Sequence, residues 1–133
     1  MADQPGVVTR RSANDAGETL RRLRAAIDHS GLTVFADVDH GGNAAEVGLP
    51  LRPTRLLVFG DPRGGTLLMQ QNQTAGLDLP LRTLVWEDAD GAAWLAYVDP
   101  HWITERYGLG PAADAAVTAI SAGLQKLAAA ATT

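Results

Sequence analysis

The pair Asp39 and His40 is the first place in the sequence where the residue types could do chemistry. Imidazole titrates near neutral pH, and a neighbouring carboxylate can fix its tautomer or stabilise its charged form. His40 could therefore serve as a general acid or base that Asp39 orients. The alternative is a histidine that only forms a hydrogen bond at a sheet end or at a subunit contact.

A glycine-rich stretch at residues 60–66 is the second such place. Gly60, Gly65 and Thr66 come close to the spacing of a phosphate-binding loop, but the lysine that such loops carry before the hydroxyl residue is missing. We therefore do not expect nucleotide binding. Backbone amides near Gly65 and Thr66 could still open a helix and hold a small anion or a carboxylate. The alternative, which we favour, is a tight turn without a ligand.

Asp61 lies in this stretch and could connect the two places. Its carboxylate could orient His40 if both loops meet at one end of the sheet, or it could cap its own turn. In the first interpretation, one pocket has Asp39 and His40 on one side and residues 60–66 on the other. This shared pocket is the leading site hypothesis from the sequence.

Arg82 is a further candidate for ligand binding. Its guanidinium group could hold an anionic ligand through two parallel donors. A surface ion pair with Glu87 or Asp88 is the simpler interpretation, although Glu87 falls on the opposite face of an unbroken strand.

The remaining residues exclude several kinds of site. The three histidines, His29, His40 and His101, are far apart and form no HxH or HExxH pattern, so we expect no metal site. The sequence names no cofactor. It has no G-x-S-x-G elbow for a serine nucleophile, and the absence of cysteine excludes disulfides, thiolate metal ligands and a cysteine nucleophile.

The composition narrows the class of protein. With 133 residues the chain has the size of one domain, and 46% hydrophobic with 20% charged residues is typical of a folded protein. The formal net charge of -4 gives no general attraction to nucleic acid or to anionic membranes. The first residues lack the apolar run of a signal peptide, so we expect a soluble cytoplasmic protein.

Apolar periodicity places the candidate residues on strands. The pattern predicts strands at residues 7–9, 32–39, 55–59, 79–88 and 92–98. In the second of these, alternation would place Val34, Ala36 and Val38 on one face. Gly91 supplies the positive φ that joins the last two strands as a hairpin. Trp94 and Tyr97 fall on opposite faces of the last strand.

Start and stop signals predict the helices. These cover about residues 15–30, 43–48, 66–75, 99–108 and 111–131. Asp15 and Glu18 have the spacing of a capping box, and Asn43 is expected to cap the second helix. The last helix carries an apolar stripe, typical of a core or a dimer contact, formed by Val117, Ile120, Leu124 and Leu127.

The order of elements indicates the fold class. A strand-helix-strand opening followed by a β-hairpin and C-terminal helices favours α+β, in two layers, with a mainly antiparallel sheet and helices packed on one face. We expect one domain over residues 1–133.

Five short motifs, in this order, resemble the family catalogued as domain of unknown function 302. They are Phe35-Ala36-Asp37-Val38-Asp39-His40, Leu51-Arg52-Pro53-Thr54, Val58-Phe59-Gly60-Asp61-Pro62 with Gly65-Thr66 and Met69, Leu77-Asp78-Leu79-Pro80-Leu81-Arg82, and Glu87-Asp88 through Gly91, Trp94 and Tyr97. The resemblance covers about residues 7–109 and leaves the C-terminal helix outside. It implies a compact two-layer α+β domain that pairs with itself and has no settled activity. One departure is Asp61, where asparagine is expected at least as often.

Three functions remain open at this point. The preferred one is a small-molecule-binding or accessory domain, acting as a homodimer, whose pocket takes a small anionic or carboxylate ligand. The second is a metal-independent enzyme that uses His40 as general acid or base with Asp39 or Asp61. The third is a structural module whose C-terminal apolar helix binds a partner.

Overall fold

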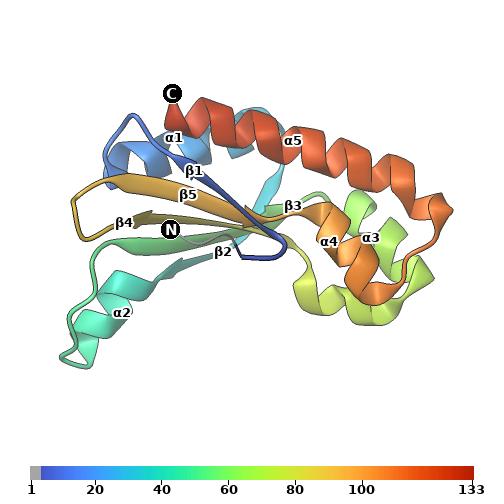
Figure 1. Ribbon diagram of the computed structural model, residues 1–133, viewed down its shortest axis with the longest axis horizontal. Helices are drawn as coiled ribbons and strands as arrows, with labels where there is room; N and C mark the ends of the chain where they lie inside the picture. The colour runs from blue at the N-terminus through green and yellow to red at the C-terminus, as the bar shows by residue number, and fades with distance from the viewer. Residues whose placement is uncertain (1–3) are drawn as a thin grey trace.

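A five-stranded sheet forms the centre of the molecule (Figure 1). The structure is a computed structural model and describes residues 4–133. The strands run in the order β1-β5-β4-β3-β2, and every neighbouring pair is antiparallel. Their bounds are β1 (Val7–Arg11), β2 (Thr33–Asp39), β3 (Thr54–Gly60), β4 (Leu81–Glu87) and β5 (Ala93–Val98).

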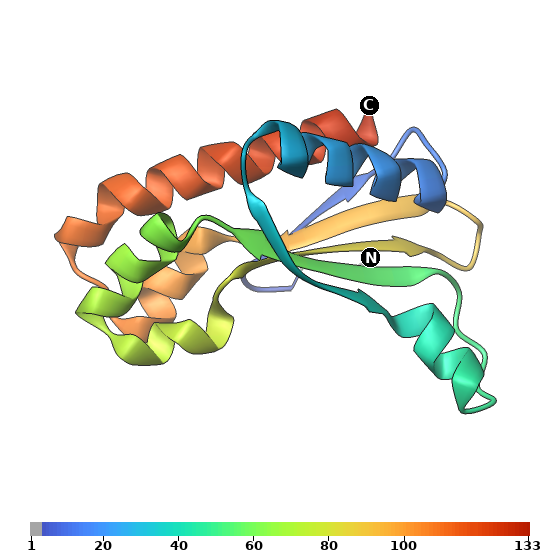
Figure 2. The same ribbon diagram turned by 180° about the vertical axis from the view of Figure 1, so that it is seen from behind.

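Two long helices, α1 (Ala16–His29) and α5 (Asp114–Thr132), lie side by side over one face of the sheet (Figures 1 and 2). At one end of the sheet gather α3 (Pro62–Gln71), the 3₁₀ helix η1 (Gln73–Asp78) and α4 (Pro100–Tyr107). A short 3₁₀ turn, η2 (Pro111–Ala113), leads into α5. At the other end, α2 (His40–Glu46) projects away from the layer of α1 and α5. The predicted α+β fold is confirmed.

The first strand, helix and second strand of the chain do not form a compact unit of neighbouring strands. β1 and β2 lie at the two opposite edges of the sheet, with β5, β4 and β3 between them. An even number of antiparallel steps separates the two edges, so β1 and β2 run in the same direction although the sheet contains only antiparallel pairs. Helix α1 therefore crosses the width of the sheet, which it helps to cover.

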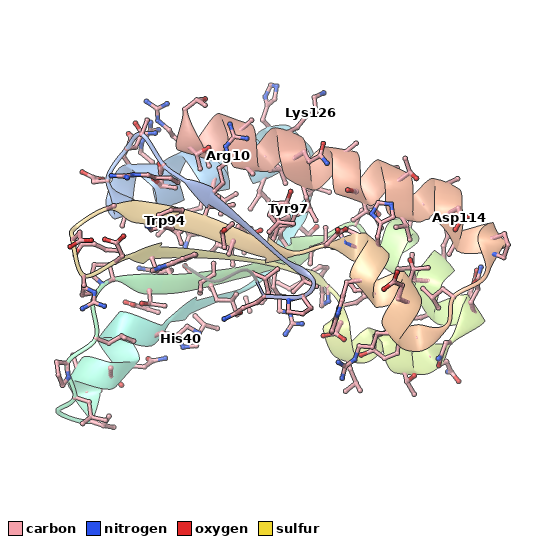
Figure 3. The ribbon with its side chains drawn as sticks, in the orientation of Figure 1. Arg10, His40, Trp94, Tyr97, Asp114 and Lys126 are labelled. Atoms are coloured by element: carbon pink, nitrogen blue, oxygen red, sulfur yellow. The ribbon has the colours of Figure 1, made fainter. Side chains whose placement is uncertain are left out.

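The main core lies between the sheet and the two long helices. Alternate strand residues such as Leu57, Phe59 and Leu95 are fully buried there. They pack against Leu23 and Ile27 of α1 and against the apolar stripe of α5. Tyr97 belongs to this core, whereas Trp94 lies on the opposite face and stacks on Trp86, as the alternation predicts (Figure 3).

A second, smaller core lies between α3, α4 and the start of α5. Its buried members are Leu68, Ile103, Leu109, Ala113 and Val117. The stripe of α5 thus joins both cores, with Leu124 and Leu127 in one and Val117 in the other. The stripe is used within the molecule, which weakens the hypothesis that this helix recruits a partner.

The predicted face of Val34 is wrong. A β-bulge between Val34 and Ala36 shifts the register, so Val34 pairs with Phe59 and Ala36 pairs with Val58. Phe59 faces the core, so Val34 shares that side, while Ala36 lies on the opposite face. A bulge adds one residue to one strand and is invisible to a simple count of alternation.

Two helices begin earlier than predicted, each directly after an aspartate. Asp39, and not Asn43, caps α2 by accepting a hydrogen bond from the Gly42 amide at 2.9 Å. Asp61 caps α3 by accepting from the Arg63 amide at 2.9 Å, and Pro62 fills the first helical position. Gly64 and Gly65, which suggested a turn before the third helix, therefore lie inside its first turns, whereas Gly60 ends β3.

Other punctuation signals are found where they were predicted. The Asp15 carboxylate accepts a hydrogen bond from the Glu18 amide at 2.8 Å at the start of α1. The Glu18 side chain contacts Arg21 instead, and within residues 4–133 it makes no hydrogen bond back to the cap. Gly91 has φ 82° in the hairpin, and Gly108 has φ 60° at the end of α4.

Candidate functional site

The two loops of the predicted shared pocket lie at opposite ends of the sheet. β2 and β3 are antiparallel, so Thr33 pairs with Gly60 while Asp39 pairs with Arg55. Asp39 and His40 therefore stand at the end of β2 that is far from Gly60 and Asp61. The shared-pocket prediction is wrong, because two consecutive loops at the carboxyl ends of antiparallel strands cannot meet at one edge. Asp61 cannot orient His40.

Each end of the sheet instead has a pocket of its own. We call the first the α3 pocket, a cavity of about 600 Å³ between α3, α5 and the adjacent sheet end. Its lining includes Phe35 from the bulge of β2, Met69 of α3 and Leu79 before β4, and α5 contributes Ile120, Leu124 and Leu127. Gly60, Gly65 and Thr66 also line it, so these predicted residues are brought together. Most of the wall is apolar.

Small residues of α5 give the α3 pocket its width. Ala119 and Gly123 are one helical turn apart, and both line the cavity. A β-carbon added at Gly123 would have no heavy atom within 4 Å. The predicted apolar stripe of this helix does not include either residue, although small residues beside Ile120 and Leu124 are a signal visible in the sequence.

Polar groups at the rim of the α3 pocket are already engaged. The Arg63 side chain donates to both carboxylate oxygens of Asp61, at 2.8 Å for the shortest contact. This hydrogen bond, with the one from the Arg63 amide, holds the pKa of Asp61 below its usual range. The Gly64 amide donates to the Asp61 carbonyl at 3.1 Å. Of the amides expected to hold an anion, that of Gly65 also points at the Asp61 carbonyl, at 3.5 Å.

The second cavity, which we call the Asp39 pocket, has a volume of about 640 Å³ at the other end of the sheet. Asp39, Arg55 and Glu87 line it, together with Asp15 and Gly42. It is more polar and more open to solvent than the α3 pocket.

Charged side chains beside the Asp39 pocket neutralise one another. Arg55 donates two hydrogen bonds to Asp37, at 2.8 and 3.1 Å, and lies 3.7 Å from Asp39. Arg24 of α1 also contacts Asp37. These pairs tie α1, β2 and β3 together at the sheet edge. They are partly exposed, so each contributes little to stability.

His40 is exposed at the first position of α2 (Figure 3). Within residues 4–133 its imidazole has no hydrogen-bond or ion-pair partner, and it does not line either pocket. The Asp39 carboxylate accepts from the Gly42 amide instead. The geometry thus brings no carboxylate into position to orient His40, and a catalytic role for it remains a prediction.

Arg82 binds neither Glu87 nor Asp88. Its side chain donates to Asp78 at 2.8 Å, and it does not line the α3 pocket. The Tyr107 hydroxyl donates to the same carboxylate, which raises the pKa of Tyr107. Arg106 lies 3.4 Å from Asp78 and 5.0 Å from the centre of the Trp102 ring. Asp78 therefore connects η1, β4 and α4, a link between distant residues that sequence spacing does not reveal.

The described residues do not offer a metal centre or a membrane span. In residues 4–133, no group of three His, Asp or Glu side chains could hold a metal ion. Over the same part of the chain, no helix combines the length and the apolar character needed to cross a bilayer. What the arrangement provides is the concave, largely apolar surface of the α3 pocket.

Comparison with known proteins gives relatives of two kinds. The chain is 47% identical over 118 residues to "Fluoride-specific ion channel FluC 1" of Brucella suis and to "Fluoride-specific ion channel FluC 2" of Brucella melitensis. The match covers 89% of this chain but only 46% and 44% of those relatives. The chain thus spans less than half the length of these relatives.

A solved structure shares the fold. The crystal structure of an uncharacterized conserved DUF302 protein from Bacillus stearothermophilus superimposes with a TM-score of 0.84, covering 98% of this chain and all of the other. Its sequence is 18% identical, so it supports the fold alone.

The family model described as "Domain of unknown function DUF302" matches residues 8–127. The match continues past Leu109 through most of α5, so the expectation that the C-terminal helix lies outside the family pattern is wrong. The physical reason is that α5 completes both cores. The family model matches nearly the whole chain, and the chain has the fold of the solved DUF302 structure. This protein therefore belongs to the DUF302 family.

Proposed function

We propose that this protein is an accessory, ligand-binding domain whose α3 pocket takes a small molecule with an apolar body. The observation that carries the proposal is the cavity of about 600 Å³ with a largely apolar wall. Pockets that bind small organic molecules have volumes of roughly 300–1,000 Å³ and mainly apolar linings with a few polar groups. Gly60, Gly65 and Thr66, which the sequence suggested as ligand-binding residues, belong to this wall.

The wall also constrains the chemistry of the ligand. Met69, Leu79 and Ile120 offer no hydrogen bonds, so a ligand body that needs them would lose its hydration without compensation. The Asp61 carboxylate at the rim repels an anion. A carboxylate head, as the sequence suggests, would therefore stay in solvent at the rim, because the Arg63 side chain nearby already donates to Asp61.

The test is a fluorescence titration with N-phenyl-1-naphthylamine, an apolar dye that brightens when it leaves water. Gly123→Leu places a side chain in the open space of the α3 pocket and also raises helix propensity by about 1 kcal/mol, so the variant should fold. The matched control is Ala122→Leu, on the same helix and outside the pocket lining.

We expect the dye to bind wild type and Ala122→Leu alike, and Gly123→Leu at least tenfold more weakly, a difference of about 1.4 kcal/mol. Equal binding by all three proteins would place the dye elsewhere and refute the α3 pocket. No brightening with wild type would refute an apolar ligand.

A second candidate function follows from the Brucella relatives. Their identity of 47% over most of this chain supports a role for the domain beside a fluoride channel. That name belongs to whole proteins more than half of which has no counterpart here, so we propose an accessory role rather than conduction itself.

This second role can be tested in the Brucella suis relative. Fluoride resistance of bacterial cells would be measured for the full-length protein, for a version lacking the matched segment, and for a version in which this chain replaces that segment. Loss on deletion and recovery on replacement would support the accessory role. Equal resistance in all three strains would count against it.

A further inference from the structure

Phe35 is an aromatic residue that a β-bulge places at the α3 pocket. Strand β3 pairs with Val34 and with Ala36, so Phe35 between them is the extra residue of the bulge. Bulges re-aim side chains and are frequent next to functional sites. Phe35 lines the cavity, and its exposed fraction is 50%. The fold therefore leaves a large aromatic side chain half uncovered beside an apolar cavity.

Four glycines line the same cavity without a structural reason to be glycine. They are Gly60 at the end of β3, Gly64 and Gly65 in α3, and Gly123 in α5. None of these four has a positive φ. A β-carbon added to any of them would meet no neighbouring side chain or strand closer than 3.5 Å, an ordinary van der Waals distance. We call these four residues the glycine wall.

The glycine wall costs the fold stability and gains open space for the cavity. Three of its members lie in helices, where glycine is less favourable than alanine. A missing side chain lets another group approach the backbone closely. Along α5 the lining runs from Ala119 to Leu127, just over two helical turns or about 12 Å. The space beside the glycine wall is long enough for two fused rings.

We propose that the apolar body of the ligand is a planar aromatic ring system, in contact with Phe35 and with the glycine wall. This inference rests on the proposed function, because it specifies the ligand of the same pocket. Two aromatic groups in offset-stacked or edge-to-face contact attract one another more strongly than the burial of their surface alone accounts for. A flat ring also approaches exposed backbone more closely than a puckered aliphatic ring of the same size. The ligand would cover the exposed part of Phe35.

Calorimetric titration of the full chain with two matched alcohols tests this proposal. 2-Naphthol and decahydro-2-naphthol share one carbon skeleton and one hydroxyl group, but only 2-naphthol is planar and aromatic. We expect wild type to bind 2-naphthol roughly three- to tenfold more tightly than the saturated compound. Phe35→Leu should bind the two compounds about equally, and it should fold because the side chain is half exposed. The matched control is Met69→Leu, which replaces another lining side chain by one of similar volume and should keep the preference.

Gly65→Ala tests the glycine wall separately. The added methyl group should raise the urea midpoint, because it increases the helix propensity of α3 and meets only ordinary contacts with Met69 and Leu79. The same methyl group takes space in the cavity, so 2-naphthol should bind several-fold more weakly. Unchanged affinity for 2-naphthol in this variant would overturn the contact with the glycine wall.

The outcomes for the two alcohols separate this inference from the proposed function. Equal binding of both compounds by wild type would overturn the aromatic ligand and leave the α3 pocket in place. A preference for 2-naphthol that survives in Phe35→Leu would overturn the contact with Phe35. Failure of both compounds to bind wild type would refute the α3 pocket itself, and this inference with it.

Discussion

The two ends of the sheet are built from the same strands and yet differ in kind. At the α3 end, helices close over the strand ends, and small or apolar residues such as Gly123 and Met69 leave a cavity. At the α2 end, charged residues such as Asp37 and Arg55 pair with one another in partial contact with solvent. The α2 end, where the sequence placed the candidate acid or base His40, therefore has its aspartates committed to a helix cap and to ion pairs.

This difference teaches how a candidate site should be weighed. Aspartates at both ends begin helices, because Asp39 and Asp61 each cap the first turn that follows them. Capping explains both residues without a ligand. The cavity at the α3 end has no comparable structural explanation, since close packing normally fills such space. The ligand site that we propose therefore rests on unfilled apolar volume and not on the aspartates.

The largest expected effect is a loss of stability, which should be large for a buried residue at the α3 end and small for an exposed residue at the α2 end. Phe59 is fully buried at the α3 end, so Phe59→Ala should lower the free energy of unfolding by about 3–5 kcal/mol. Val47→Ala, at the end of α2 where the side chain is 71% exposed, should change it by less than about 0.5 kcal/mol. Urea denaturation measures both. Similar losses for the two variants would mean that the ends do not differ as described.

Replacing one glycine at each end with alanine should change the stability of the fold in opposite directions. Gly123→Ala should raise the free energy of unfolding by about 0.5–1 kcal/mol, because α5 gains helix propensity and the new methyl meets no atom within 4 Å. Gly42→Ala in α2 should lower it, because the new β-carbon would lie 2.6 Å from the Asp39 carboxylate and displace the cap. Thermal unfolding of both variants checks the opposite signs.

A smaller effect appears only in acid. The Trp94 indole donates to Asp88 at 2.8 Å, and this bond, with amide donors from Ala92 and Asp90, lowers the pKa of Asp88 from 3.8. A carboxyl group whose folded pKa is depressed stabilises the fold above its unfolded pKa. That stability is lost as the pH falls through the folded pKa.

Asp88→Asn removes this titration while keeping an acceptor for Trp94. Between neutral pH and pH values below 3.8, the urea midpoint of wild type should therefore fall further than that of the variant. Parallel pH profiles for the two proteins would show that the indole bond does not hold the charge of Asp88.

The smallest effect concerns His40. It is exposed and has no polar partner within residues 4–133, so His40→Ala should change the free energy of unfolding by less than about 0.5 kcal/mol. Dye binding in the α3 pocket should also remain unchanged, because His40 stands at the other end of the sheet. Weaker dye binding in this variant would require contact between the two ends.

Local signals in the sequence predicted most of the fold. Asp15, Gly91 and Gly108 act through their own backbone neighbourhood, and each was found in its expected role. The wrong predictions concern features that depend on contacts between residues far apart in the sequence. The bulge at Phe35 follows from pairing with β3, and its effect on the face of Val34 cannot be counted from β2 alone.

The site was harder to predict for the same reason. Gly60, Gly65 and Thr66 do line a pocket, but their partners Ile120 and Gly123 lie some fifty residues away on a helix that the family resemblance had left out. The pairing of His40 with Asp61 failed because loop proximity depends on strand direction, and residue spacing does not fix that direction. Apolar periodicity shows which side of a helix or strand faces the core, but it does not show whether a cavity remains between two packed elements.

The position of β1 at the sheet edge has a consequence for how the protein is made. Its one neighbour in the sheet is β5, with Val7 paired to Val98, and Arg10 reaches Thr132 of α5. A ribosome releases β1 long before it releases either partner. Of the five strands, β1 can therefore join the sheet only after β5 has been made, and until then its backbone groups remain available to another strand.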